Sequence, residues 1–270
     1  MGSYIFQMDR NRRRRFGQNF LDDAMAYAIA SDLPVQKAQH LLEIGPGHGA
    51  LTRHLVGRSA SITAVEIDPE CAQKVESQFA KNGITVINQD FMHFDLDSFL
   101  DRHPGLWVAG NLPYNVATAI LVRLVESMPR LEGIMAMVQY EVALRLCAKP
   151  GSSDYGSLSV LVSSNCNATL LRKVGPEHFT PKPNVDSATV LLTPRTPPLA
   201  VPPGFFEFVQ SCFKHKRKRL SNSLEGRWSK AQVATAVADL GRSEHSRAEE
   251  FSPEDFLMLF DHLHNISEEP

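Results

Sequence analysis

The tetrad Asn111-Leu112-Pro113-Tyr114 has residue types suited to moving a group onto the exocyclic amine of a flat base. The side-chain oxygen of Asn111 and the carbonyl oxygen of Leu112 can each accept an amine proton, which turns the nitrogen lone pair toward an electrophile. Pro113 fixes its own φ and restricts Leu112, so both acceptors are held before substrate arrives. Tyr114 offers a ring face on which an extruded base stacks. These are also ordinary turn residues, so the tetrad alone leaves a plain strand-to-helix turn open.

Two predicted strands indicate how the tetrad is positioned. The apolar residues 106–109 have the length and composition of a buried strand, so the tetrad should lie at its carboxyl end. Open α/β sheets bind ligands at that edge. Residues 40–44 predict another strand, which runs into Gly45, Gly47 and Ala50. This spacing fits the glycine fingerprint of nucleotide-binding βαβ units, in which missing side chains let backbone approach the ligand, but a lone fingerprint is not specific.

Acidic side chains follow the next two predicted strands. Residues 61–65 lead to Glu66, about 20 residues beyond the glycine loop, where an acid can take both ribose hydroxyls of an adenosine group. Residues 84–88 lead to Asp90, which could accept a hydrogen bond from an adenine amino group beside apolar Phe91. A helix cap or a solvated loop would also explain either acid. Ligand-type residues at three successive strand ends favour an adenosine site.

Size and composition predict one large α/β domain with a small appendage. The chain has 270 residues, of which 43% are hydrophobic, and a formal net charge of −2. No apolar run approaches the ~18 residues of a membrane span, and no secretory signal is present. Four scattered cysteines without a Cys-x-x-Cys pair or a histidine grouping at metal spacing indicate reduced thiols in a cytoplasmic protein without zinc.

Prolines mark the expected domain boundary. Residues 196–204 form a predicted linker between an α/β domain at residues 1–195 and a helical domain at residues 205–270. The amphipathic helices expected in the second domain span residues 205–224, 230–240 and 253–264.

The segment before the linker should complete the sheet. Residues 167–174 and 188–192 predict a closing strand pair, while residues 155–163 leave helix and strand open. The loop between the paired strands starts near Phe179, which could cover the opposite face of a base stacked on Tyr114. A place in the core is the alternative for Phe179.

Basic residues are concentrated in two short stretches despite the near-neutral total. Such clusters can bind phosphates, although a solvated surface is the alternative for each. The candidate nucleic-acid contacts are Arg12, Arg13, Arg14 and Arg15 in the first stretch and Lys214, Lys216, Arg217 and Lys218 in the second.

A glycine loop followed by an acid one strand later is also typical of dehydrogenases, which are the first alternative class of enzyme. A nicotinamide enzyme also needs proton-transfer or metal chemistry near its substrate, and no obvious His or Lys constellation supplies it. An S-adenosylmethionine site fits better, because a sulfonium methyl is activated without a metal or an acid, and the protein has mainly to orient the reactants.

Five segments together resemble the bacterial small-subunit rRNA adenine dimethyltransferases. The resemblance runs from about residue 15 to residue 256 and includes Arg217, Lys218, Leu220 and Asn222. The segments are Gln18-Asn19-Phe20-Leu21, Glu43-Ile44-Gly45-Pro46-Gly47, Asn111-Leu112-Pro113-Tyr114-Asn115, Tyr155-Gly156-Ser157-Leu158-Ser159-Val160 and Phe179-Thr180-Pro181-Lys182-Pro183-Asn184-Val185-Asp186-Ser187.

The resemblance implies a class I S-adenosylmethionine-dependent methyltransferase fold, Rossmann-like with a mostly parallel seven-stranded sheet, and a small C-terminal helical domain that binds RNA. The implied reaction is dimethylation of the N6 amino groups of two adjacent adenosines in a hairpin near the 3′ end of 16S rRNA, within the assembling small ribosomal subunit. The protein would act as a monomer without a metal or a membrane.

The resemblance also assigns roles to residues. The implied catalytic residues are Asn111, Leu112, Pro113, Tyr114 and Phe179. The implied cofactor-binding residues are Asn19, Leu21, Gly45, Gly47, Glu66, Ile67, Asp90, Phe91 and Asn111. Because a monomethyl amine has a single proton left, we expect Asn111 and the Leu112 carbonyl to share its alignment without a dedicated general base.

Two positions depart from the family pattern. His48 stands where leucine is common, and Tyr140 where lysine is usual. Two other functions stay open: a large-subunit rRNA adenine methyltransferase of the macrolide-resistance type, which shares the glycine loop and the tetrad, and a ribosome assembly factor that acts mainly by binding.

Overall fold

A computed structural model describes residues 19–215 and 218–268 of the chain. The contacts divide it into two compact units. Unit 1 comprises the residues up to Ala143 together with Ala168–Pro194, and unit 2 comprises Leu144–Asn167 with the residues from Arg195 onward. The expected boundary at residue 195 therefore misses one insertion, because Leu144–Asn167 packs with the C-terminal residues rather than with the sheet.

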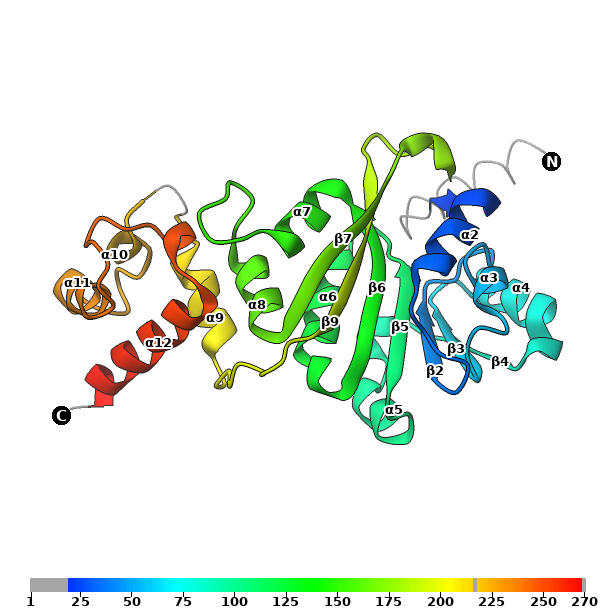
Figure 1. Ribbon diagram of the computed structural model, residues 1–270, viewed down its shortest axis with the longest axis horizontal. Helices are drawn as coiled ribbons and strands as arrows, with labels where there is room; N and C mark the ends of the chain where they lie inside the picture. Colours follow the sequence, from blue (N-terminus) through cyan, green and yellow to red (C-terminus); the bar gives the residue numbers. More distant parts are fainter. Residues whose placement is uncertain (1–18, 216–217, 269–270) are drawn as a thin grey trace. The chain divides into compact units, whose positions relative to one another are not determined.

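A seven-stranded sheet has the strand order β4-β3-β2-β5-β6-β9-β7 (Figure 1). The β2–β3, β3–β4, β2–β5 and β5–β6 pairs are parallel, and β9 pairs with β6 antiparallel. In this order the strands span Ile84–Asn88, Ser61–Glu66, His40–Ile44, Leu106–Asn111, Leu131–Gln139, Ser187–Pro194 and Cys166–Val174. The chain runs outward from β2 through β3 to β4 and then restarts at β5 on the other side. The expected mostly parallel α/β sheet is confirmed, and its switch point, where such folds bind ligands, lies between β2 and β5.

Helices bury both faces of the sheet. Leu41, Trp107 and Met135 belong to one buried cluster with residues of α2 and α3, while the neighbouring Leu42 and Val108 point the other way and are also buried. The helices that begin before the insertion are α2 Asp23–Asp32, α3 Thr52–Leu55, α4 Pro69–Phe79, α5 Leu96–Arg102, α6 Ala117–Glu126 and α7 Tyr140–Cys147. Double-sided burial explains why these strands read as apolar runs rather than alternating patterns.

A small antiparallel pair ties the N-terminal segment to the loop before β9. Strand β1, Phe20–Leu21, pairs with β8, Phe179–Thr180. The backbone N–H of Asp22 extends the pairing by donating to the His178 carbonyl at 2.8 Å. This pairing holds the residues just before α2 against the body of unit 1.

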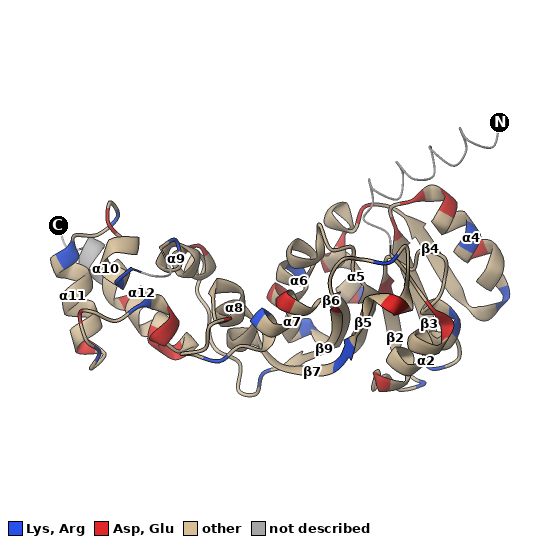
Figure 2. Cartoon of the chain, turned by 90° about the horizontal axis from the view of Figure 1, so that it is seen from above, with Lys and Arg blue, Asp and Glu red and all other residues tan. Residues whose placement is uncertain are grey.

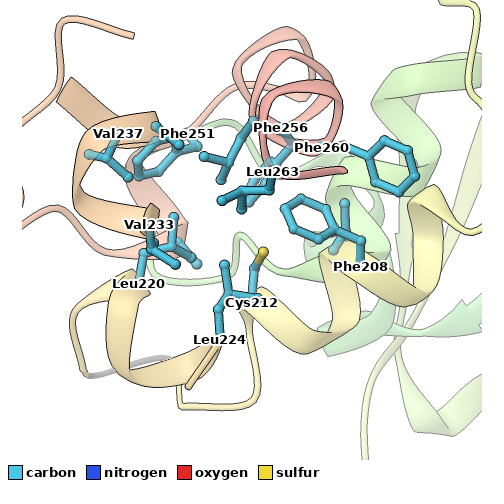
Figure 3. Packing of buried hydrophobic residues seen from close by; sticks show 14 of the residues in the cluster. Phe208, Cys212, Leu220, Leu224, Val233, Val237, Phe251, Phe256, Phe260 and Leu263 are labelled. Carbon is cyan, nitrogen blue, oxygen red and sulfur yellow. The ribbon is translucent and has the colours of Figure 1, made fainter. Parts of the chain in front are cut away.

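Unit 2 has a separate hydrophobic core built from its own helices. Phe208 of α9, Leu224 after α10, Val233 of α11 and Leu263 of α12 point toward one another in Figure 3. The helices of this unit are α8 Ser157–Asn165, α9 Phe205–Cys212, α10 Leu220–Ser223, α11 Lys230–Asp239 and α12 Pro253–Glu268. The open pattern at residues 155–163 resolves as helix α8, which packs on α9 and α12.

The expectation of one continuous helix over residues 205–224 is wrong. Helix α9 ends at Cys212, and α10 starts at Leu220, whose side chain is buried in the unit 2 core. After Phe213, the intervening residues 214–219 are all Lys, Arg or His and include no apolar side chain. An amphipathic helix loses its packing face over such a stretch, and neighbouring like charges repel.

Charges of both signs occur throughout the described ribbon (Figure 2). Helix α4, for example, carries Glu70, Lys74 and Glu76 within its span. None of the helices in the described residues combines the length and the apolar character that a membrane crossing requires.

Candidate active site

A cavity lies at the carboxyl ends of β2, β3, β4 and β5. All but one of the residues predicted to bind cofactor or to act on the substrate line it. They are Asn19, Leu21, Gly45, Gly47, Glu66, Ile67, Asp90, Phe91, Asn111, Leu112, Pro113 and Tyr114. Residues separated by up to 95 positions in the chain, Asn19 and Tyr114 at the extremes, thus share one wall. Parallel strands bring most of them to the same edge of the sheet, and the β1–β8 pairing holds the N-terminal ones.

The glycine loop after β2 requires residues without a Cβ at two positions. Gly45 and Gly47 have φ values of +66° and +56°, a region that L side chains rarely adopt. A Cβ on Gly47 would also lie 3.1 Å from the ring of Phe20. The loop therefore presents bare backbone to the cavity and lets the N-terminal segment pack closely beside it.

Glu66 at the end of β3 is buried and organises this loop. Its carboxylate accepts hydrogen bonds from the backbone N–H groups of Gly47 and Asp68, both at 2.9 Å. Burial raises the pKa of Glu66, and the two backbone donors oppose that rise. The acid predicted to hold ribose hydroxyls thus lies at the cavity wall with its position fixed by backbone.

Glu43, the last but one residue of β2, was not predicted as a site residue and also lines the cavity. Its side chain is 1% exposed, and its Oε2 has no hydrogen-bond partner in the described part of the chain. Burial raises the pKa of Glu43 to about 8. The signal in the sequence was an acid inside an otherwise apolar strand immediately before the glycine loop.

The turn after β4 supplies the predicted adenine end. Asp90 accepts a hydrogen bond from the Met92 N–H at 2.9 Å and thereby caps the short 3₁₀ helix η2, Phe91–His93. Phe91 is buried, whereas Ile67 after β3 is 42% exposed although it is apolar. Both belong to the cavity wall, so an apolar surface and a carboxylate lie together at this end.

The tetrad forms a tightly bonded corner after β5. The Leu112 N–H donates to the Met137 carbonyl at 3.1 Å, and the Pro113 carbonyl accepts from Val116 at 3.1 Å and from Ala117 at 2.9 Å. The side-chain Nδ2 of Asn111 donates to the Asn19 carbonyl at 3.1 Å. With its NH₂ group committed to that bond, the Asn111 amide keeps its oxygen as an acceptor.

Tyr114 is held by a hydrogen bond to strand β9. Its hydroxyl lies 2.5 Å from the Ser187 Oγ at the start of β9. Burial raises the pKa of Tyr114. The ring is therefore a fixed, neutral surface beside the corner rather than a base.

The N-terminal segment closes one side of the cavity. The Phe20 ring stacks on His48 of the glycine loop, with ring centroids 3.7 Å apart and planes 10° from parallel. A hydrogen bond of 2.8 Å between the His178 Nδ1 and an Asp22 carboxylate oxygen lies beside the β1–β8 strands. His48, which departs from the family pattern, thus contributes a flat contact for this segment.

Phe179 is not brought to the cavity. It is 4% exposed, pairs with Leu21 in the β1–β8 ladder and belongs to the hydrophobic cluster that contains α2. The predicted stacking of a base between Phe179 and Tyr114 stays a prediction, and the strand partner of Phe179, Leu21, does line the cavity. An aromatic residue in a proline-stiffened loop gives no local signal that separates a core position from a site position.

The other departure, Tyr140, has a basic neighbour. The Lys173 Nζ lies 4.8 Å from the centre of the Tyr140 ring and 2.7 Å from an Asp186 carboxylate oxygen. The Tyr140 N–H donates to the Asp186 carbonyl at 2.9 Å. A strand residue distant in sequence thus supplies a cation beside the position where lysine was expected.

The predicted basic clusters are only partly described. Arg12, Arg13, Arg14 and Arg15 lie outside the described residues, as do Lys216 and Arg217. Lys214 and Lys218 are exposed in unit 2.

The open α/β sheet has a glycine loop at its switch point, an acid after the next strand and an antiparallel strand, β9, beside β6. Together with the similarity to a methyltransferase structure, these features show a class I S-adenosylmethionine-dependent methyltransferase. The family described as Ribosomal RNA adenine dimethylase matches residues 9–265, and the chain belongs to this family. It is therefore an rRNA adenine dimethyltransferase that uses S-adenosylmethionine as methyl donor.

Similar proteins cover nearly the whole chain. The ribosomal RNA small subunit methyltransferase A of Rubrobacter xylanophilus is 39% identical over 250 residues, which is 92% of this chain and 94% of the relative. The protein of the same name from Pseudomonas aeruginosa is 39% identical over 232 residues, or 84% of this chain and 87% of the relative.

Two solved structures share the fold. A dimethyladenosine transferase from Plasmodium falciparum has a TM-score of 0.76 at 20% identity, covering 93% of this chain and 98% of that one. The 23S rRNA methyltransferase ErmE has a TM-score of 0.67 at 28% identity, covering 91% of this chain and all of that one.

Proposed function

We propose that this enzyme dimethylates the N6 amino groups of two adjacent adenosines in a hairpin near the 3′ end of 16S rRNA, within the assembling small ribosomal subunit. The observation that carries the proposal is the Asn111-Leu112 corner in the wall of the cofactor cavity, with the Asn111 NH₂ group already committed to the Asn19 carbonyl. The choice of ribosomal subunit is supported by the names of relatives 39% identical to this chain.

The cavity residues fit S-adenosylmethionine. Gly45 and Gly47 leave a cradle of backbone that a Cβ would fill. Glu66 has the position and chemistry to hold ribose hydroxyls, and Asp90 to accept from an adenine amino group. Ile67 and Phe91 supply apolar surface for the adenine ring, and Asn19, Leu21 and Asn111 complete the wall around the methionine part. When bound, the cofactor supplies an electrophilic methyl group on a sulfonium.

The tetrad orients the nucleophile in this proposal. The Asn111 Oδ1 and the Leu112 carbonyl oxygen accept the amine protons and aim the nitrogen lone pair at the methyl group. Pro113 keeps the two acceptors in place, and Tyr114 stacks on the adenine. The raised pKa of Tyr114 keeps its phenol protonated, so no residue of the tetrad acts as a general base. In the second transfer the amine has one proton left, which either oxygen can accept. In each round the proton released by the methylated nitrogen passes to water, because no residue of the tetrad takes it up.

Recognition of the subunit is assigned to the basic clusters. Arg12, Arg13, Arg14 and Arg15, together with Lys214, Lys216, Arg217 and Lys218, would contact rRNA phosphates. With a total charge of −2, affinity for naked RNA should be low, so the assembled subunit, rather than free RNA, is the proposed partner of a cytoplasmic monomer.

A large-subunit methyltransferase is the second candidate, because the ErmE structure is also similar over nearly the whole chain. Primer extension separates the two. Purified protein and S-adenosylmethionine are incubated with small or large subunits that lack the modification. We expect strong stops at two neighbouring adenosines of 16S rRNA. Stops in 23S rRNA would favour the second candidate, and binding to small subunits without stops would favour a pure assembly factor.

A further inference from the structure

One cation from α6 holds the turn that forms the predicted adenine end of the cavity. The Arg123 guanidinium donates to the Phe91 carbonyl through Nη1 and to the Phe94 carbonyl through Nη2. Its central carbon also lies 5.3 Å from the centre of the Phe91 ring. Arg123 is half-buried, so these contacts are formed away from bulk water.

The turn is also supported by packing, since Phe91 and Phe94 are buried and the Phe94 and Phe99 ring centroids lie 5.2 Å apart. Its internal bonds are short-range: Asp90 accepts from the Met92 N–H at 2.9 Å, and the Phe91 carbonyl accepts from the Phe94 N–H at 3.1 Å. Arg123 lies 32 residues from Phe91 in the chain and therefore bonds the turn to another element. Hydrogen bonds from a charged donor are stronger than neutral ones, particularly where water is partly excluded.

The helix that carries Arg123 is also fixed to the acceptor corner. Helix α6 begins at Ala117, and the Ala117 N–H donates to the Pro113 carbonyl at 2.9 Å. A single helix therefore connects the tetrad at its start with the turn of Asp90 and Phe91 about two helical turns later. Displacing that turn would move the adenine end relative to the corner.

We propose that Arg123 is a positioning residue for the cofactor, which sets the Asp90-Phe91 turn against the adenine ring. The inference rests on the proposed function for the assignment of that turn to adenine. Arg123 touches neither reactant, and its effect reaches the cofactor through the two carbonyl groups that it holds.

The test compares Arg123→Gln with a matched arginine variant. Arg130→Gln also removes a guanidinium that bridges elements, since Arg130 bonds Asp97 and Asp101 of α5, but at a site away from the cavity lining. The probes are S-adenosylhomocysteine and 5′-methylthioadenosine, which keeps adenine and ribose and lacks the amino-acid part. Calorimetric titration gives each dissociation constant, and initial rates on unmodified small subunits give KM and kcat.

For Arg123→Gln we expect both dissociation constants and the cofactor KM to rise about tenfold, or about 1.4 kcal/mol, with kcat changed less than about twofold. Arg130→Gln should bind both probes like wild type. Should Arg123→Gln fail to fold, Arg123→Lys, which keeps the charge and loses the two-carbonyl geometry, should show a smaller loss of the same kind.

Three results would overturn the inference: wild-type affinity in every Arg123 variant that folds, a loss confined to S-adenosylhomocysteine, or a lower kcat without weaker binding. Failure of wild-type protein to bind either probe would instead refute the assignment of the cavity to an adenosine cofactor. The two failures are therefore distinguishable.

Discussion

Asn111 combines two roles in one amide group. Its nitrogen secures the N-terminal segment through the Asn19 carbonyl, and its oxygen remains for the acceptor amine. An aspartate at this position would lose the donor and repel the carbonyl, and an alanine would lose both roles. This explains in physical terms why an amide, rather than any small polar residue, suits the corner.

Replacement of Asn111 by Ala should lower kcat by a factor on the order of 10² to 10³, by analogy with removal of one transition-state hydrogen-bonding partner. Affinity for S-adenosylhomocysteine should change less, because the glycine loop and Glu66 remain. Single-turnover methylation and calorimetric binding measure the two effects. Unaltered turnover in the variant would remove Asn111 from the chemistry.

Glu43 should make stability depend on pH. Its pKa is raised from 4.5 to about 8 by burial, so the folded state keeps a proton that the unfolded state releases in this range. The contribution of Glu43 to the free energy of unfolding is therefore at its maximum below about pH 4.5. It falls as pH rises toward 8, by up to about 1.4 kcal/mol per pH unit.

Glu43→Gln keeps the shape and removes this titration. The difference in unfolding free energy between variant and wild type should shift in favour of the variant as pH rises from about 5 to about 8, measured by urea denaturation. Parallel pH profiles for the two proteins would show that the Glu43 carboxyl ionises normally in the folded state.

At the scale of elements, Phe179 belongs to the packing of β1 and β8. Removing a buried aromatic side chain leaves a cavity, so Phe179→Ala should lower the free energy of unfolding by about 3–5 kcal/mol. Tyr27, which is 63% exposed, is the control, and Tyr27→Ala should change it by less than about 0.5 kcal/mol. Chemical denaturation tests both. A Phe179→Ala protein of wild-type stability would argue that the residue is not part of the core.

The sequence predicted the central elements well, because each carries its own local signal. Residues 40–44 and 84–88 coincide with β2 and β4. An apolar run bounded by glycine, proline or an acid predicts its element correctly when the residues are apolar along the whole element. The basic stretch after Cys212 was misread as helix because propensity does not register the loss of a packing face.

The candidate site was predictable only where strand ends revealed it. Glu66, Asp90 and Asn111 follow apolar strands, so topology alone brings them to one edge. The contacts of Arg123 with Phe91 and of Lys173 with Tyr140 join residues that are distant in sequence. No periodicity encodes such pairs. Glu43 was marked only by its charge within an apolar strand.

At the scale of the whole molecule, binding to the small subunit should depend on the basic stretch of unit 2. Changing Lys216, Arg217 and Lys218 together to Ala should weaken subunit binding and reduce the salt slope by roughly 0.7–0.9 for each lost phosphate contact. Filter binding across a salt series measures the slope, and cofactor affinity should be unchanged.

A control with the same change in charge is available on unit 1. Lys37, Lys74 and Lys81 are exposed, and their joint replacement by Ala should leave the salt slope near that of wild type. Equal slopes for all three proteins would remove the basic stretch from the RNA interface. A common loss in both variants would instead indicate that only total charge matters.

The hydrogen bond between Asn111 and Asn19 affects how two successive methyl transfers to one amine can proceed. Each round consumes one donor molecule, and the spent one has to leave a cavity whose wall includes residues 19–21. If residues 19–21 move outward, the Asn111 amide loses its hydrogen bond to the Asn19 carbonyl and with it the orientation of its side-chain oxygen. Exchange of the cofactor then weakens binding of the target base. This favours release of partly methylated RNA between the two transfers over processive methylation.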